Sequence, residues 1–170
     1  MPLTRDSTEP MTEAALRKQL LRLLAGEDAH MTFEEAVADF PDEAINQRPP
    51  NVAYTPWQLL EHVRLTQLDI LDYVTNADYV EQSWPADYWP DPDAMATPAQ
   101  FAETIRLYLA DREALAELVD DSGRDLYAVI PKSRGHTLLR EIRIVADHTA
   151  YHVGEFAILR QIMGTWPADR

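Results

Sequence analysis

Residues 55–76 read TPWQLLEHVRLTQLDILDYVTN, and this stretch decides the fold class. Thr55 offers a hydroxyl that can cap a helix, and Pro56 follows at the first helical position, where its missing N–H costs no hydrogen bond. Leucine, isoleucine and valine then recur at helical spacing as far as Val74. The pattern predicts one long amphipathic helix that ends near Asn76.

Three further segments carry the same periodicity, and the chain has almost no strand signal. The expected long helices cover residues 11–26, 55–76, 97–122 and 137–163, with a shorter helical piece at residues 32–40. Four long amphipathic helices predict an all-α four-helix bundle. The loop before the second long helix is short, so we expect the first two long helices to be neighbours. We also expect the second and fourth to pack side by side, with Trp57, near the start of the second, buried.

The segment between the second and third long helices, residues 77–98, shows no periodicity and is rich in tryptophan, tyrosine and proline. An irregular stretch of about 20 residues is long for a compact domain. It therefore predicts either a functional segment or a long crossover that carries the chain from the end of one helix to the start of the next.

Composition narrows the class of protein. A length of 170 residues predicts one domain, residues 1–170, and we expect residues 1–10 to be flexible. The formal net charge of −14 argues against a nucleic-acid backbone or an anionic membrane as the partner. There is no apolar run long enough to span a membrane, and the polar first residues lack a signal-peptide pattern, so we expect a cytoplasmic location.

Cysteine is absent, which excludes disulfides, thiolate metal ligands and a nucleophilic cysteine. A bound metal would have to use nitrogen and oxygen ligands. Any thiol in the chemistry would belong to a substrate.

The candidate metal ligands are three histidines. His148 and His152 are four residues apart in a helical segment, so their rings lie on one face and can bind one divalent cation. His62 lies on an apolar face of another helix. If the two helices pack together, the three imidazoles converge and leave a coordination position open to water or substrate. The alternative is that these histidines are ordinary core or surface residues.

Other residues near this pattern allow two interpretations each. Glu155 can orient a ligand histidine, or it can be a solvated carboxylate. His30 and His136 fall at helix boundaries, which favours loop or capping roles. No HExxH motif is present, which argues against a zincin-type protease. Four aromatic residues could line a pocket mouth or anchor the core and loops: Trp57, Trp84, Tyr88 and Trp89.

The stretches TPWQLLEH (residues 55–62) and DHTAYHVGEF (residues 147–156) together resemble the DinB/YfiT-like superfamily of metal-dependent proteins. The resemblance covers nearly the whole chain. It implies a four-helix bundle with a long crossover, and a divalent metal, zinc or nickel, on His62, His148 and His152. It also implies a homodimer. Characterised relatives include transferases and isomerases that use bacillithiol, mycothiol or glutathione.

These observations lead to three hypotheses of function. The first is a metal-dependent thiol S-transferase with a small-molecule substrate. The second is a metal-dependent hydrolase. The third is a non-catalytic, stress-associated metalloprotein in which the metal only cross-links two helices. The sequence singles out no catalytic residue beyond the metal ligands.

Overall fold

The structure, a computed structural model, describes residues 12–168, and within that range its regular elements are all helices, with no strand and one isolated bridge between Val129 and Thr137. The elements in chain order are α1 (Glu13–Ala25), α2 (Phe33–Val37), η1 (Asp42–Ala44), α3 (Pro56–Thr75), η2 (Ala86–Tyr88), α4 (Pro98–Asp120) and α5 (Leu138–Met163). The all-α bundle is confirmed. The flexibility expected of residues 1–10 concerns a part of the chain outside the described residues.

Local chemistry fixes the helix ends. The Thr55 hydroxyl accepts from the backbone N–H of Gln58, whose side chain in turn accepts from the N–H of Thr55, which forms a capping box at the start of α3. Thr97 and Gln100 repeat the arrangement at α4. Gly164 ends α5 at a φ of 64°, a left-handed conformation that glycine adopts without steric cost.

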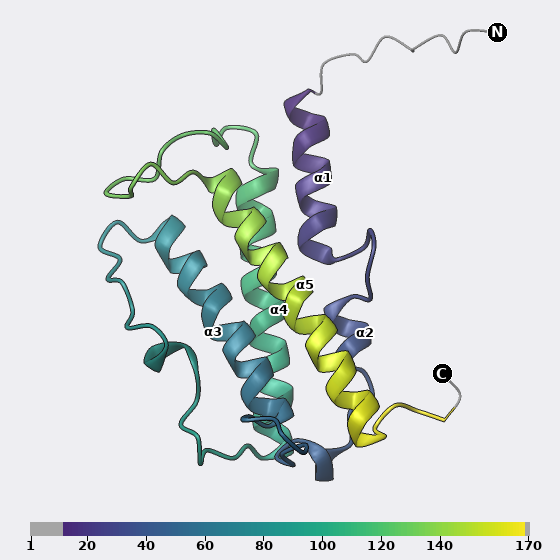
Figure 1. Cartoon of the computed structure of the whole chain (residues 1–170). Coiled ribbons are helices and arrows are strands. Elements are labelled where there is room, and N and C mark those ends of the chain that lie inside the picture. Colours follow the sequence, from purple (N-terminus) through teal and green to yellow (C-terminus); the bar gives the residue numbers. More distant parts are fainter. Residues whose placement is uncertain (1–11, 169–170) are drawn as a thin grey trace, which may run out of the picture.

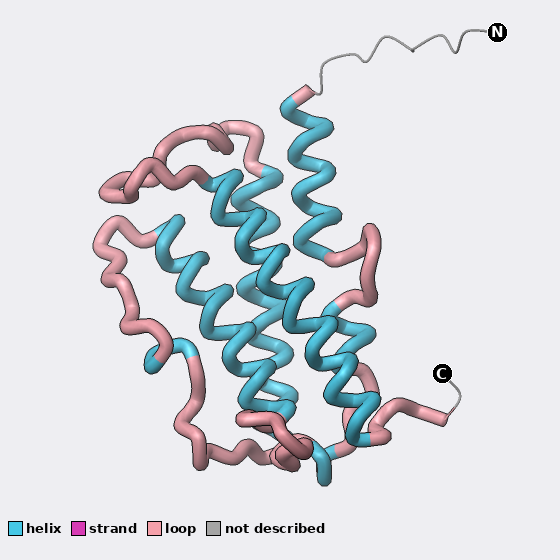
Figure 2. Tube along the Cα trace, viewed as in Figure 1, coloured by secondary structure: helices cyan, strands magenta, loops and turns pink. Residues whose placement is uncertain are grey.

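The long helices form one bundle with a crossover (Figures 1 and 2). α3 packs against both α4 and α5. α3 and α4 run in the same direction, so the segment after α3 returns along the outside of that helix before α4 begins (Figure 1). The long crossover predicted for residues 77–98 is therefore present, and it passes close to the face of α3 that carries His62.

The expectation that the first two long helices are neighbours is wrong. α1 packs against α4 and α5, and α2 packs against α5. α1 and α2 lie one after the other along the same side of the bundle, and α1 lies on the side away from α3 (Figure 1). The connection between α1 and α3 explains why these helices are not neighbours. It contains α2 and η1, which carry the chain to the far end of the bundle before α3 begins.

The core consists of two apolar clusters separated by a polar layer. One cluster joins α2 to the first half of α3 and includes Phe33, Leu59 and Phe156. The other joins α1 to the first turns of α5 and includes Leu115 and Ile142. Buried polar side chains lie between them on α3 and α5: His62, Gln67, Thr149 and His152. Burying polar groups costs free energy unless they are paired. We therefore expect this polar layer to serve a function and not the stability of the bundle.

Candidate metal centre

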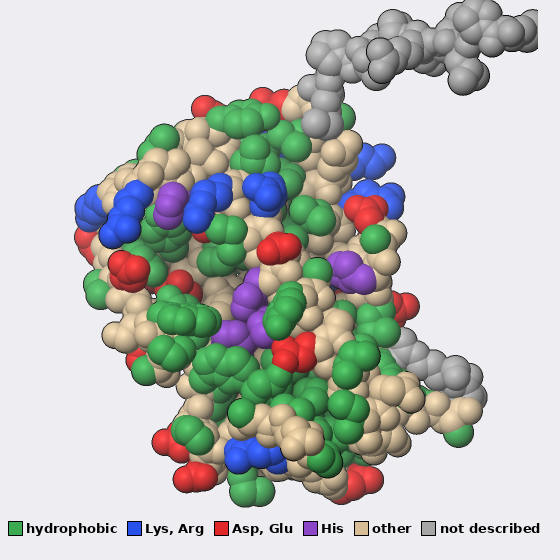
Figure 3. All heavy atoms as spheres, in the orientation of Figure 1, with side chains coloured by type: hydrophobic (Ala, Val, Ile, Leu, Met, Phe, Trp, Pro, Cys, Tyr) green, Lys and Arg blue, Asp and Glu red, His purple; other side chains and the backbone are tan. Residues whose placement is uncertain are grey.

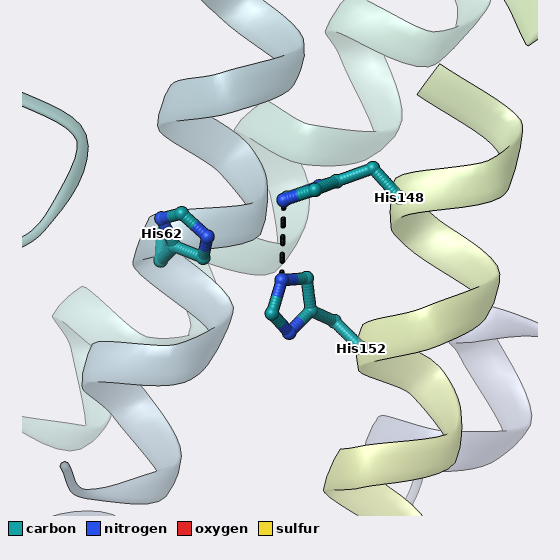
Figure 4. A group of neighbouring side chains, drawn as sticks. All are labelled: His62, His148 and His152. Carbon is teal, nitrogen blue, oxygen red and sulfur yellow. Dashed lines mark hydrogen bonds between the residues drawn. The ribbon is translucent and has the colours of Figure 1, made fainter. Parts of the chain in front are cut away.

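The structure brings the three predicted histidines together in the polar layer. His62 projects from α3, and His148 and His152 project from α5 toward it (Figure 4). One ring nitrogen from each lies within 4.8 Å of those of the other two. The Nε2 atoms of His148 and His152 are 3.1 Å apart. The expected packing of these two helices side by side is thus confirmed.

The outward nitrogens of His62 and His152 are both bound by acceptors. His62 Nδ1 lies 2.7 Å from the carbonyl oxygen of Tyr88, and His152 Nδ1 lies 2.7 Å from Oε2 of Glu155. A carbonyl or a carboxylate can only accept, so both histidines must carry their proton on Nδ1. This assignment leaves the lone pair on Nε2 of each ring.

The partner of His148 is a hydroxyl, which can donate or accept. Its Nδ1 lies 3.2 Å from the hydroxyl oxygen of Thr66, and that hydroxyl also lies within hydrogen-bond distance of the carbonyls of His62 and Val63. When Thr66 donates its single proton to one of these carbonyls, its oxygen can accept from Nδ1–H of His148. In that state all three imidazoles offer Nε2 as a ligand, the arrangement that metal-binding histidines require.

Burial keeps these rings neutral. Desolvation, reinforced by the neighbouring imidazoles, lowers the pKa of His148 to about 4 and that of His152 to about 3. Desolvation also lowers the pKa of His62. At neutral pH the rings of His148 and His152 are therefore uncharged, and their Nε2 atoms lie 3.1 Å apart, where one ring can donate a hydrogen bond to the other. A divalent cation also fits this arrangement when both rings carry their proton on Nδ1, since it accepts both Nε2 lone pairs.

Glu155 joins the centre to the loop before α3. One carboxylate oxygen binds His152, and the other accepts a hydrogen bond from the hydroxyl of Tyr54. Desolvation raises the pKa of Glu155. Of the two sequence interpretations, the orienting carboxylate is the one that the structure supports, because the side chain is half-buried and bound on both sides.

The crossover holds His62 from the opposite side. The indole of Trp89 stacks on the His62 ring, with centroids 3.9 Å apart and planes 6° from parallel. The Gln58 amide nitrogen lies within hydrogen-bond distance of three crossover carbonyls, those of Asp91, Pro92 and Ala94. The irregular segment of residues 77–98 is therefore both a crossover and a support for the ring of His62.

The other tryptophans and histidines that the sequence analysis singled out are not part of the cluster of three histidines. Trp57, expected to be buried, is only partly buried against the apolar cluster, and its indole N–H donates to the Thr104 hydroxyl at 3.2 Å. Trp84 is 68% exposed beside the His62 ring. His30 contacts the carbonyl of Met31 and His136 contacts the Tyr73 hydroxyl, so neither joins the cluster of three histidines.

Sequence reasoning missed Tyr54, Thr66 and the carbonyl of Tyr88. Thr66 carried a signal, since it lies one helical turn after His62 and so on the same face. Tyr54 directly precedes the capping residue of α3, a position that says nothing of a partner on α5. A backbone carbonyl leaves no signal in a sequence.

The centre reaches the surface between α3 and α5. His62 and His152 are only 2% and 8% exposed, yet histidine atoms are visible between these helices in the space-filling view (Figure 3). Within residues 12–168, the cluster includes no fourth histidine, aspartate, glutamate or cysteine. Three neutral ligands would therefore leave part of a metal's coordination shell to water or to a small molecule.

Comparison with known proteins gives one match. The sequence model of the DinB superfamily matches residues 25–156, which includes all three histidines and the crossover. No curated protein and no solved structure matches the chain. No helix within residues 12–168 is long and apolar enough to cross a membrane.

Proposed function

The chain belongs to the DinB superfamily, and from that premise we propose that it holds one divalent metal ion, zinc or nickel, on Nε2 of His62, His148 and His152. The observation that carries the proposal is the convergence of the three rings, whose ligand nitrogens lie within 4.8 Å of one another, while the Nδ1 atoms of all three have partners on the other side. Imidazole ligands suit both metals.

We further propose that the protein is a metal-dependent thiol S-transferase acting on a small molecule. A cation at this centre would supply a Lewis acid that lowers the pKa of a coordinated thiol or water. Three neutral ligands would not offset the cation's charge, which favours a strong effect. The absence of cysteine means that the thiol would come from a substrate.

The chain's own residues would position and shield the reaction. Glu155 and Tyr54 fix the ring of His152, and Trp89 covers one face of His62. The exposed aromatic side chains of Trp84 and Tyr151 flank the centre and would offer apolar surface to the electrophile. A metal that only cross-links helices is less well supported, because such a site usually closes its shell with a fourth protein ligand.

Metal analysis and a substrate panel test this proposal together. Purified protein should carry one zinc or nickel per chain, and His152→Ala should lose that metal while its far-ultraviolet circular dichroism stays helical. A panel of thiols with a chromogenic alkylating electrophile should then show turnover that His152→Ala abolishes. Turnover of ester or amide substrates without a thiol would favour the hydrolase instead. If His152→Ala unfolds, the metal is a structural cross-link.

The remaining parts of the proposal concern the whole chain. We propose one domain over residues 1–170, a cytoplasmic location and a homodimer. The homodimer follows from the family resemblance, and α5 carries exposed apolar side chains at Tyr151, Ile158 and Ile162.

A further inference from the structure

A cavity of about 640 Å³ lies beyond the histidine centre, at the end of α3 and the beginning of α5. Its walls come from the last two turns of α3, the crossover, the loop before α5 and the first turn of α5. The volume is in the range of small-molecule binding sites. Neither the histidine ligands nor the family match assigns any role to it.

The cavity lies on the same helix faces as the metal centre. Asp69 in its wall follows His62 by seven residues on α3, and Glu141 precedes His148 by seven residues on α5. Seven residues make about two helical turns, which return to the same face and span about 10 Å. Tyr88 joins the two places directly, because it lines the cavity and its carbonyl binds His62.

Basic side chains gather at this cavity, in contrast to the rest of the chain. Lys132, Arg134, His136 and Arg140 all line it. Lysine and arginine side chains cluster around a histidine over the loop that precedes α5 (Figure 3). In a chain with a net charge of −14, such a cluster gives an anion a locally favourable potential.

Most acidic side chains of the cavity already have hydrogen-bond or ion-pair partners within the protein. The two carboxylate oxygens of Asp69 accept hydrogen bonds of 2.9 Å from the hydroxyls of Tyr79 and Tyr88. The buried carboxylate of Glu141 is paired with Arg140. Glu81 is the remaining acid of the lining, and it is exposed.

The basic side chains of the loop before α5 have fewer partners within the protein. Lys132 donates to the carbonyl of Ala77 and lies 3.9 Å from the exposed carboxylate of Asp78. Within residues 12–168, no hydrogen bond or ion pair engages Arg134. The loop itself is fixed, since the Ile130 N–H donates to the His136 carbonyl at 2.8 Å. Lys132 and Arg134 are thus presented at the cavity by an ordered turn, with capacity to bind a ligand.

We propose that this cavity binds an oxyanion, a carboxylate or a phosphate, at one end of the small molecule whose other end reaches the histidine centre. The inference rests on the proposed function and defines its substrate class. The substrate would be an elongated anionic molecule with about 10 Å between its anionic group and its metal-binding group. Compact uncharged thiols would bind more weakly, because they cannot reach Lys132 and Arg134.

The first test uses cobalt(II)-loaded full-length protein, in which thiolate binding gives a charge-transfer band that can be titrated. Glutathione, an anionic thiol, should bind at least about tenfold more tightly than uncharged 2-mercaptoethanol, the gain expected of one or two charged hydrogen bonds. The pair Lys132→Ala and Arg134→Ala should remove that advantage and leave 2-mercaptoethanol unchanged. The control pair, Lys18→Ala and Arg106→Ala, removes the same charge from exposed positions elsewhere and should retain it.

The second test needs no metal and so separates the two proposals. Inorganic phosphate and S-methylglutathione are each titrated into metal-free protein and followed by amide chemical shifts. Shifts confined to the cavity and lost in the Lys132→Ala/Arg134→Ala protein support the inference, and the probe that causes them distinguishes a phosphate from a carboxylate. If cobalt or thiols fail to bind, the proposed function fails while this titration still decides the cavity's role. Equal losses in both variant pairs, or no shifts at the cavity, would overturn the inference.

Discussion

The carboxylate of Glu155 binds two partners at once, the ring of His152 and the hydroxyl of Tyr54. Replacing Glu155 by Gln keeps the shape but removes the charge that strengthens the His152 Nδ1–H bond. We expect metal affinity to fall by about 10- to 100-fold, the usual cost of losing such a partner. Competition with a chelator measures the affinity directly.

The matched control is Tyr54→Phe, which removes only the hydroxyl and should cost less affinity than Glu155→Gln. Circular dichroism should be unchanged in both variants. Equal metal affinities for the parent protein and Glu155→Gln would show that Glu155 does not orient His152.

The neutral state of the histidines makes the stability of the metal-free protein depend on pH. Burial lowers the pKa of His148 from 6.5 to about 4 and that of His152 from 6.5 to about 3. Below pH 6.5 the unfolded chain therefore binds more protons at these rings than the folded chain does. The free energy of unfolding should fall as the pH drops from about 6.5, and their contribution should be fully lost below about pH 3.

Urea midpoints measured between pH 7 and pH 4 check this expectation. Other groups also titrate in that window, so the comparison is with a His148→Gln/His152→Gln protein, whose two rings are absent. Its stability should decline less steeply between pH 6.5 and pH 4. Parallel declines would mean that the two histidines are not responsible.

At the scale of elements, Trp57 couples the start of α3 to α4. Its ring packs against the apolar cluster while its N–H donates to Thr104, and the side chain remains partly exposed. Trp57→Ala should therefore lower the free energy of unfolding by roughly 2–3 kcal/mol, less than the 3–5 kcal/mol typical of a fully buried tryptophan.

Chemical denaturation provides the measurement for this variant. Trp57→Phe, which keeps most of the ring and loses only the hydrogen bond, should recover more than half of the loss. An unchanged urea midpoint in Trp57→Ala would show that the ring does not stabilise the junction between α3 and α4.

The elements that the sequence predicted are those with local signals. Thr55-Pro56 and Thr97-Pro98 start helices through contacts within a few residues, so α3 and α4 could be predicted to within a residue or two. The four-residue spacing of His148 and His152 likewise needs only a helix to bring their rings together. What could not be predicted depends on distant contacts. The His62–Tyr88 bond joins α3 to an irregular segment, and α1 packs on α4 and α5 instead of beside α3.

At the scale of the whole molecule, the distribution of charge separates two regions. Between residues 130 and 143 the chain has four basic residues, Lys132, Arg134, Arg140 and Arg143, and one acidic residue, Glu141. The remainder is strongly acidic. A metal cation is attracted to such a molecule as a whole, whereas an anionic substrate would be admitted only near the basic segment. The proposed metal centre and the proposed anion cavity adjoin each other at this boundary.

The predicted homodimer must form against this net charge. Two protomers of formal charge −14 repel each other, and dissolved salt screens that repulsion over about 8–10 Å at physiological ionic strength. The dimer should therefore tighten as salt increases, because association would rest on apolar contact. Light scattering at micromolar concentration should give twice the chain mass of 19.4 kDa, with the dimer fraction rising between low and physiological salt. A monomeric mass at every salt concentration would contradict the dimer. A dimer that dissociates as salt rises would show instead that complementary charges, such as the basic segment of one protomer against an acidic surface of the other, hold it together.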